Sequence, residues 1–129
     1  MALFNKKTTD TLDAPLDVIA KADTLAFGGV GIAGSLLPAT QAYFSIEEAL
    51  GSQPDRRPAL RPRLERMLDS ATPAGRIYAA ELLNHVEATA GEAAWRRLAK
   101  QDDEVRTFTG CIMGKTTVRR YANDRLTGR

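Results

Sequence analysis

The sequence of 129 residues has little of several residue types: one cysteine, one histidine and only 6% aromatic residues. A single cysteine, Cys111, cannot form a disulfide within the chain, which is in keeping with a reducing compartment. One cysteine and one histidine cannot by themselves fill a closed structural zinc site, so we expect no metal and no cofactor. The few aromatic rings also leave little on which nucleic-acid bases could stack.

An excess of charge of either sign is also lacking, because 18 basic residues face 16 acidic ones and the net charge is +2. The basic pI of 8.9 therefore does not by itself argue for a polyanionic partner. The first thirteen residues contain no apolar core after their lysines, so they do not resemble a secretory signal. We expect a cytoplasmic protein with one globular domain over residues 1–129, of which 1–12 are flexible.

Charge is absent altogether from Thr24 through Ser45, a stretch long enough to cross a bilayer. Its glycines and hydroxyl residues make it much less apolar than a spanning helix, so we do not expect membrane insertion. The part from Gly28 to Ser35 is rich in both glycine and apolar residues, which predicts a closely packed connection or a surface for homo-oligomers.

What is present is mainly helical periodicity. Starts are marked by Asp13 before Pro15 and by Thr72 before Pro73, and a capping box at Thr89 and Glu92 opens a later helix. The pattern predicts an all-α fold of about six helices. They cover about residues 13–25, 37–50, 62–69, 72–86, 89–101 and 117–126.

Residues 103–114 are ambiguous. Val105, Phe108 and Ile112 fit helical spacing, whereas the threonines and Gly110 favour extended structure. We interpret the segment as a helix and leave open a short hairpin near residues 104–117.

Two segments thirty residues apart resemble each other. Residues 71–80 and 101–110 each begin with polar turn residues, place an arginine early, add an aromatic residue two positions later and then two small residues. In this respect the region from about 58 to 114 resembles short HEAT-like repeats, with Arg76 and Arg106 at the matching positions. The resemblance implies stacked helix pairs that offer an extended surface for binding.

Catalytic patterns are weak. The sequence Gly29 to Gly34 matches the dinucleotide fingerprint literally, but the segment before it predicts a helix instead of the required strand. Cys111 and His85 could form a nucleophile and its base only if the fold brought them together. The carboxylate pairs 47–48 and 102–103 are sequential and so point to different sides. We therefore expect a protein that is not an enzyme.

Two kinds of binding remain. Arginines at 56, 57, 61, 63 and 66, extended by basic residues at 96, 97, 100, 119, 120 and 125, could form a nucleic-acid surface. We favour instead a protein-protein interaction module, such as a small adaptor or an inhibitory, immunity-type partner, because no nucleic-acid motif accompanies the charges. Arginine and large aromatic residues are the usual interface anchors, although Trp95 fits a core position equally well. The candidate partner-binding residues are Arg63, Arg66, Trp95, Arg96, Arg119 and Tyr121.

The glycine-rich segment gives a first prediction. Replacing Gly31 or Gly34 with valine would force a side chain into a close contact, so Gly31→Val and Gly34→Val are each expected to lower the thermal unfolding temperature or to abolish self-association. Unfolding curves that coincide with those of the parent protein would remove the argument.

Overall fold

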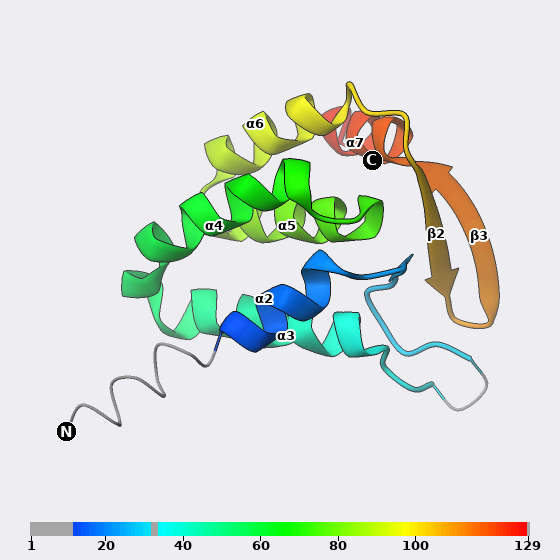
Figure 1. The fold of residues 1–129 in the computed structure, drawn as a ribbon, viewed down its shortest axis with the longest axis horizontal. Helices are drawn as coiled ribbons and strands as arrows, with labels where there is room; N and C mark the ends of the chain where they lie inside the picture. Colours follow the sequence, from blue (N-terminus) through cyan, green and yellow to red (C-terminus); the bar gives the residue numbers. More distant parts are fainter. Residues whose placement is uncertain (1–11, 32–33, 129) are drawn as a thin grey trace.

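The computed structural model describes residues 12–31 and 34–128, which contain six α-helices and three short β-strands (Figure 1). The structure does not describe residues 1–11, 32–33 and 129. The flexibility expected for 1–11 therefore lies outside the described residues, as do two positions of the Gly28–Ser35 segment and the last residue of the proposed domain. The elements are α2 (Asp13–Ala20), β1 (Thr24–Leu25), α3 (Pro38–Ser52), the 3-10 turn η1 (Pro54–Arg56), α4 (Arg57–Ser70), α5 (Pro73–Val86), α6 (Ala88–Leu98), β2 (Glu104–Thr109), β3 (Ile112–Thr117) and α7 (Val118–Leu126).

Helix α5 is the central element. It packs against α2, α3, α4, α6 and α7 and against strands β1 and β2. Eight of its fourteen residues are buried, and Ala79 and Ala80 among them let neighbouring helices approach closely. Figure 1 shows α4, α5 and α6 along one side, α2 and α3 along the other, and the two long strands at one end. The helix predicted over residues 72–86 is confirmed.

The start of α5 is fixed by a cap that also reaches α2. The Thr72 side-chain oxygen accepts a hydrogen bond from the Gly75 N–H at 3.1 Å, and its hydroxyl donates to the Ala22 carbonyl at 2.6 Å. A Cβ atom on Gly75 would lie 2.5 Å from the Ile19 carbonyl oxygen, so only glycine permits this approach of α2. The predicted N-cap at Thr72 is confirmed.

Other helix boundaries differ from the prediction. Helix α2 ends at Ala20, earlier than expected, because residues 24–25 pair with a strand instead. Helix α4 begins at Arg57, five residues before the start predicted at about residue 62. The capping box before α6 is not formed, because Glu87 is the N-cap and the Thr89 hydroxyl donates to the Glu87 carboxylate at 2.7 Å.

The region interpreted as a helix at residues 103–114 is a hairpin. Strands β2 and β3 pair antiparallel from Glu104↔Thr117 to Thr109↔Ile112, and β1 pairs parallel with β2. Gly110 has a φ of 59° and stands first in the two-residue turn, a position that favours glycine in type II′ hairpins. The helix interpretation was wrong, and the hairpin left open near 104–117 is correct. The fold is mostly helical with a small mixed sheet, not purely all-α.

The thirty-residue similarity does not correspond to a structural repeat. Residues 73–80 form the first turns of α5, whereas residues 104–109 form strand β2. Arg76 and Arg106 therefore lie in different kinds of element. Helices α4, α5 and α6 do pack in succession, but the structure shows no repeated unit across the two segments.

The glycine-rich segment is partly close-packed. A Cβ atom on Gly29 would lie 2.4 Å from the Gly34 carbonyl oxygen, whereas none at Gly31 or Gly34 would meet another atom within 4 Å. Gly31 and Gly34 instead have φ values of 72° and 65°, which a valine rarely adopts. The cause expected for the two valine substitutions is thus backbone strain and not a steric contact. In the uncharged stretch, residues 24–25 form β1 and residues 38–45 belong to α3. No helix in the described ranges is long and apolar enough to span a membrane.

A buried hydroxyl fixes the chain directly after β1. The Tyr78 hydroxyl donates to the Ala26 carbonyl at 2.6 Å and accepts from the Ala26 N–H at 2.9 Å. The Thr40 hydroxyl donates to the same carbonyl at 2.8 Å. Three elements, α3, α5 and the strand connection, therefore meet at one backbone position, and Tyr78 and Thr40 are both fully buried.

This arrangement predicts a large effect of removing one oxygen atom. Tyr78→Phe leaves the buried Ala26 N–H without its partner and is expected to lower the free energy of unfolding by about 1–3 kcal/mol. Tyr43→Phe is the matched control, because the Tyr43 hydroxyl donates at the longer distance of 3.4 Å to the carboxylate of Glu47, whose side chain is partly exposed. Its loss should cost less than about 1 kcal/mol. Equal costs in urea unfolding would show that the buried hydroxyl has no special role.

Candidate interaction site

The β2–β3 hairpin carries the two most exposed large apolar side chains of the described residues. Ile112 and Met113 are 74% and 63% exposed, more than any other large apolar side chain in the described residues. They follow the turn, where Cys111 is also exposed. Figure 1 shows the hairpin extending along one end of the helical layers. Neighbouring exposed apolar residues are the usual mark of a binding surface.

The base of the hairpin is held firmly. Val105 in β2 and Val118 at the start of α7 are buried. The Val118 N–H donates to the Asp103 carbonyl at 2.9 Å, which continues the pairing beyond β3. Arg76 of α5 contacts the Asp103 carboxylate at 3.0 Å. The exposed end is therefore carried on a rigid base.

One face of the hairpin combines apolar and basic side chains. Phe108 lies directly opposite Met113, and Arg106 lies directly opposite Lys115. Glu104 approaches Lys115 at 3.8 Å, the long end of an ion pair, and Arg106 has no charged partner among the described residues. Two cations thus face each other across the hairpin, and the one carboxylate nearby approaches only Lys115.

A second cluster joins α7 to α5 and α6. The Tyr121 and Trp95 rings are 5.7 Å apart, and the Arg125 guanidinium lies 5.6 Å from the centre of the Trp95 ring. Arg125 also contacts Glu81 at 2.9 Å, and the Tyr121 hydroxyl donates to Glu81 at 3.3 Å. Burial raises the pKa of the Glu81 carboxyl, whose side chain is 12% exposed, although Arg125 and Tyr121 act to lower it.

The single histidine connects α5 to α3. Its Nε2 atom lies 2.8 Å from the Glu47 carboxylate and 3.5 Å from the Tyr43 hydroxyl. Burial, reinforced by the charges of Glu47 and Glu81, raises the pKa of Tyr43. No serine or cysteine hydroxyl or thiol bonds to His85 in the described residues. The arrangement links two helices, and Cys111 is not among the groups that contact His85.

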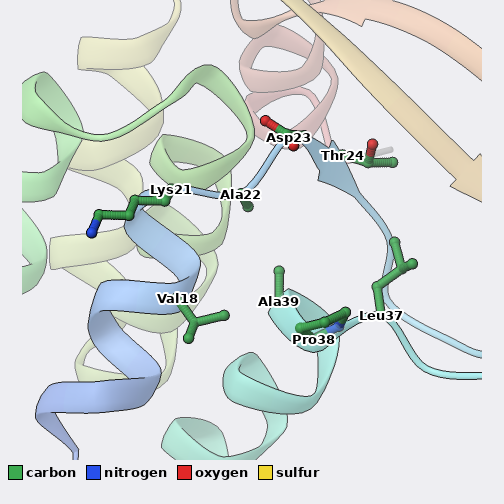
Figure 2. Close-up of a pocket in the computed structure, with 8 residues that line it drawn as sticks. All are labelled: Val18, Lys21, Ala22, Asp23, Thr24, Leu37, Pro38 and Ala39. Carbon is green, nitrogen blue, oxygen red and sulfur yellow. The ribbon is translucent and has the colours of Figure 1, made fainter.

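Two clefts flank these elements. A cleft of about 440 Å³ lies between residues 25–29 and 107–110, with Tyr121 on one wall. It lies where the chain after β1 turns away from strand β2, because the Tyr78 hydroxyl bonds to the backbone of Ala26. A shallower one of about 310 Å³ lies between the ends of α2 and α3 (Figure 2). Figure 2 shows its apolar side chains Val18, Pro38 and Ala39 together, while Lys21 extends away from them. Neither cleft gathers the groups of a catalytic site.

The six residues predicted for partner binding lie in separate places. Arg63 contacts Asp13 at 2.6 Å and shares a cleft of about 280 Å³ with Arg66. Trp95 is 3% exposed, which is the core position that the sequence also allowed, and it contacts Tyr121. Arg96 pairs with Glu92 within α6, and Arg119 pairs with Asp102 at 3.0 Å. The structure thus brings together only one pair in each of two places.

The predicted cationic surface is partly neutralised by carboxylates. Its arginines with an acidic partner in the described residues include Arg61, Arg63, Arg96, Arg97, Arg119 and Arg125. No group of three potential metal ligands lies together in the described ranges. Cys111 is in the hairpin turn and His85 is on α5, where it contacts α3.

Sequence reasoning missed the two most exposed residues of the hairpin. Apolar character alone would assign core positions to Cys111, Ile112 and Met113. The available signal was Gly110, a turn former flanked by threonines, which would have placed the three residues in a hairpin turn.

No family model, curated protein or solved structure matches the chain.

The buried carboxylate of Glu81 predicts how stability depends on pH. The folded protein holds a proton on Glu81 more tightly than the unfolded chain, so the favourable contribution is complete below the ordinary value of 4.5 and is lost as the pH rises through the raised pKa. Glu81→Gln should therefore flatten the fall in unfolding free energy above about pH 4.5. Denaturant unfolding over a pH series measures this, with the exposed Glu48→Gln as control; a parental slope for Glu81→Gln would contradict it.

Proposed function

We propose that this protein is a non-enzymatic protein-binding module that docks through the β2–β3 hairpin. The observation that carries the proposal is the adjacent pair Ile112 and Met113, exposed at one end of a rigidly anchored hairpin. Exposing such side chains to water is unfavourable by about 1.5–3 kcal/mol each, which a bound partner would recover. Nothing in the packing of the described core requires them.

The helical layers act in this proposal as the scaffold. The HEAT-like packing predicted for residues 58–114 reduces to a rigid support formed by α4, α5 and α6. Of the residues predicted for binding, Arg119 and Tyr121 lie on α7 directly after β3, so they belong to the surface next to the hairpin. Either an adaptor or an inhibitor of immunity type could use such a surface, because both need a preformed, rigid element.

The nucleic-acid alternative is less well supported. Most arginines have carboxylate partners, which would have to be broken before phosphates could bind. The exposed pair beside the turn is apolar, and apolar contact contributes little to phosphate binding. We therefore place protein binding first.

The single cysteine makes the proposal testable. A photo-cross-linker attached to the exposed Cys111 would react with whatever covers the hairpin end. In native lysate, treated or not treated with nuclease, the parent should give one stoichiometric protein adduct identified by mass spectrometry. Met113→Asp should reduce the adduct about tenfold or more, because it places a charge in an apolar contact.

Leu126→Asp is the matched control, because Leu126 is an exposed apolar residue on α7, away from the turn. It should leave the adduct unchanged. The proposal is rejected if Met113→Asp and the parent capture the same set of proteins, or if every adduct disappears with nuclease.

A further inference from the structure

The outer edge of strand β3 is open. The sheet order is β1-β2-β3, and no other strand of the described chain lies beyond β3. Residues 112–115 are all exposed. Proteins usually protect such an edge with proline, a bulge, charged side chains or a covering element, because its free backbone groups pair readily with another strand. Here β3 has neither a proline nor an irregularity in its pairing with β2, and its one charged side chain, Lys115, is of the sign that an acidic segment would neutralise.

The pairing register shows which backbone groups are free. A two-residue hairpin turn is closed by a hydrogen-bonded pair, and such pairs alternate along the ladder with non-hydrogen-bonded ones. Thr109 and Ile112 close this turn. Gly114 and Thr116 therefore direct their backbone groups toward β2, and Met113 and Lys115 direct theirs outward.

Charge on the same residues points to the kind of partner. Arg106 and Lys115 are directly opposite each other, an arrangement that destabilises a strand pair when both carry the same charge. A carboxylate on a third strand beside Lys115 would lie on the same face and relieve this repulsion. An apolar side chain two positions away would lie beside Met113 and Phe108.

We infer that β3 binds its partner by strand addition, and that the partner is an extended protein segment with an acidic residue beside Lys115 and an apolar residue beside Met113. This inference rests on the proposed function and specifies its partner. The backbone groups of Met113 and Lys115 supply the hydrogen bonds, and the alternating side chains supply specificity.

A second copy of this chain is the competing occupant. Pairing two β3 strands would bring Lys115 and Arg106 of both copies onto neighbouring strands. That arrangement adds like charges to a face that already has too few carboxylates. The charge pattern therefore favours an acidic partner.

Amide hydrogen exchange with synthetic peptides tests the inference. The probe is an extended peptide of repeated Val-Thr-Glu-Thr units, and the control replaces each Glu with Lys. The acidic peptide should bind about tenfold or more tightly than the basic one at low salt. It should slow exchange at the Met113 and Lys115 amides about tenfold or more, without changing Gly114 and Thr116, which are already bonded within the hairpin.

Two substitutions at one position separate the backbone from the charge. Lys115→Thr keeps the outward N–H and removes the charge, whereas Lys115→Pro removes both. Binding of the acidic peptide should fall in the order parent, Lys115→Thr, Lys115→Pro, and Lys115→Glu should make the basic peptide the preferred one. If the proline disturbs the hairpin, the exchange pattern of the parent protein still decides the question.

Several results would overturn the inference. Equal binding of both peptides would contradict the proposal that the partner is acidic. Protection confined to amides outside β3 would contradict strand addition. Protection of Met113 that grows with protein concentration in the absence of peptide would identify a second copy as the occupant. If the Cys111 cross-linker captures a protein that Met113→Asp releases while no peptide protects β3, the proposed function stands and strand addition alone is wrong.

Discussion

The hydrogen bonds of the Tyr78 hydroxyl to the backbone of Ala26 determine how the helical and sheet parts of this protein meet. Tyr78 comes from the central helix α5, and Thr40 of α3 reaches the same carbonyl. Phe27 then places its ring 5.1 Å from Tyr43 and 5.2 Å from Tyr78 in edge-to-face contacts. A buried backbone position satisfied by two side chains is costly to disturb, because each lost bond leaves an unpaired polar group.

This constraint also limits the sheet. Since Ala26 turns toward α5, β1 pairs with β2 over only two residues before the chain departs. The pairing resumes only at single bridges of Val30 with Ser35 and Gly110. Strand β2 thus has a short, interrupted neighbour on one side and the full-length β3 on the other. The hairpin is consequently supported by its base and its connection to α7, and its turn end remains in solvent.

Much of the helical architecture follows from the sequence, and the hairpin does not. The cap at Thr72 and the helical periodicity of residues 72–86 and 117–126 are local signals, and each led to an element in the expected place. Residues 103–114 carry an apolar spacing compatible with two structures, and the choice depends on β1, which lies about eighty residues earlier and was itself assigned to a helix. Strand pairing over such a separation cannot be read from local periodicity. The candidate site was missed because Met113 is exposed only in the β2–β3 hairpin, whose local signal, Gly110 between threonines, competed with the helical spacing of the same residues.

The positions of the ion pairs favour the hairpin over the arginine-rich helices as the proposed binding surface. On α4, α6 and α7 six arginines pair with carboxylates, so much of the charge on these helices is already neutralised; they are Arg61, Arg63, Arg96, Arg97, Arg119 and Arg125. On β2 and β3 there is less balance, since the one nearby carboxylate, Glu104, approaches Lys115 and leaves Arg106 without a charged partner among the described residues. A surface whose charges are already paired contributes little binding free energy, because the cost of desolvating the ion pairs offsets the new contacts with the partner. A surface that combines unbalanced charge, apolar side chains and open backbone groups gains from all three at once.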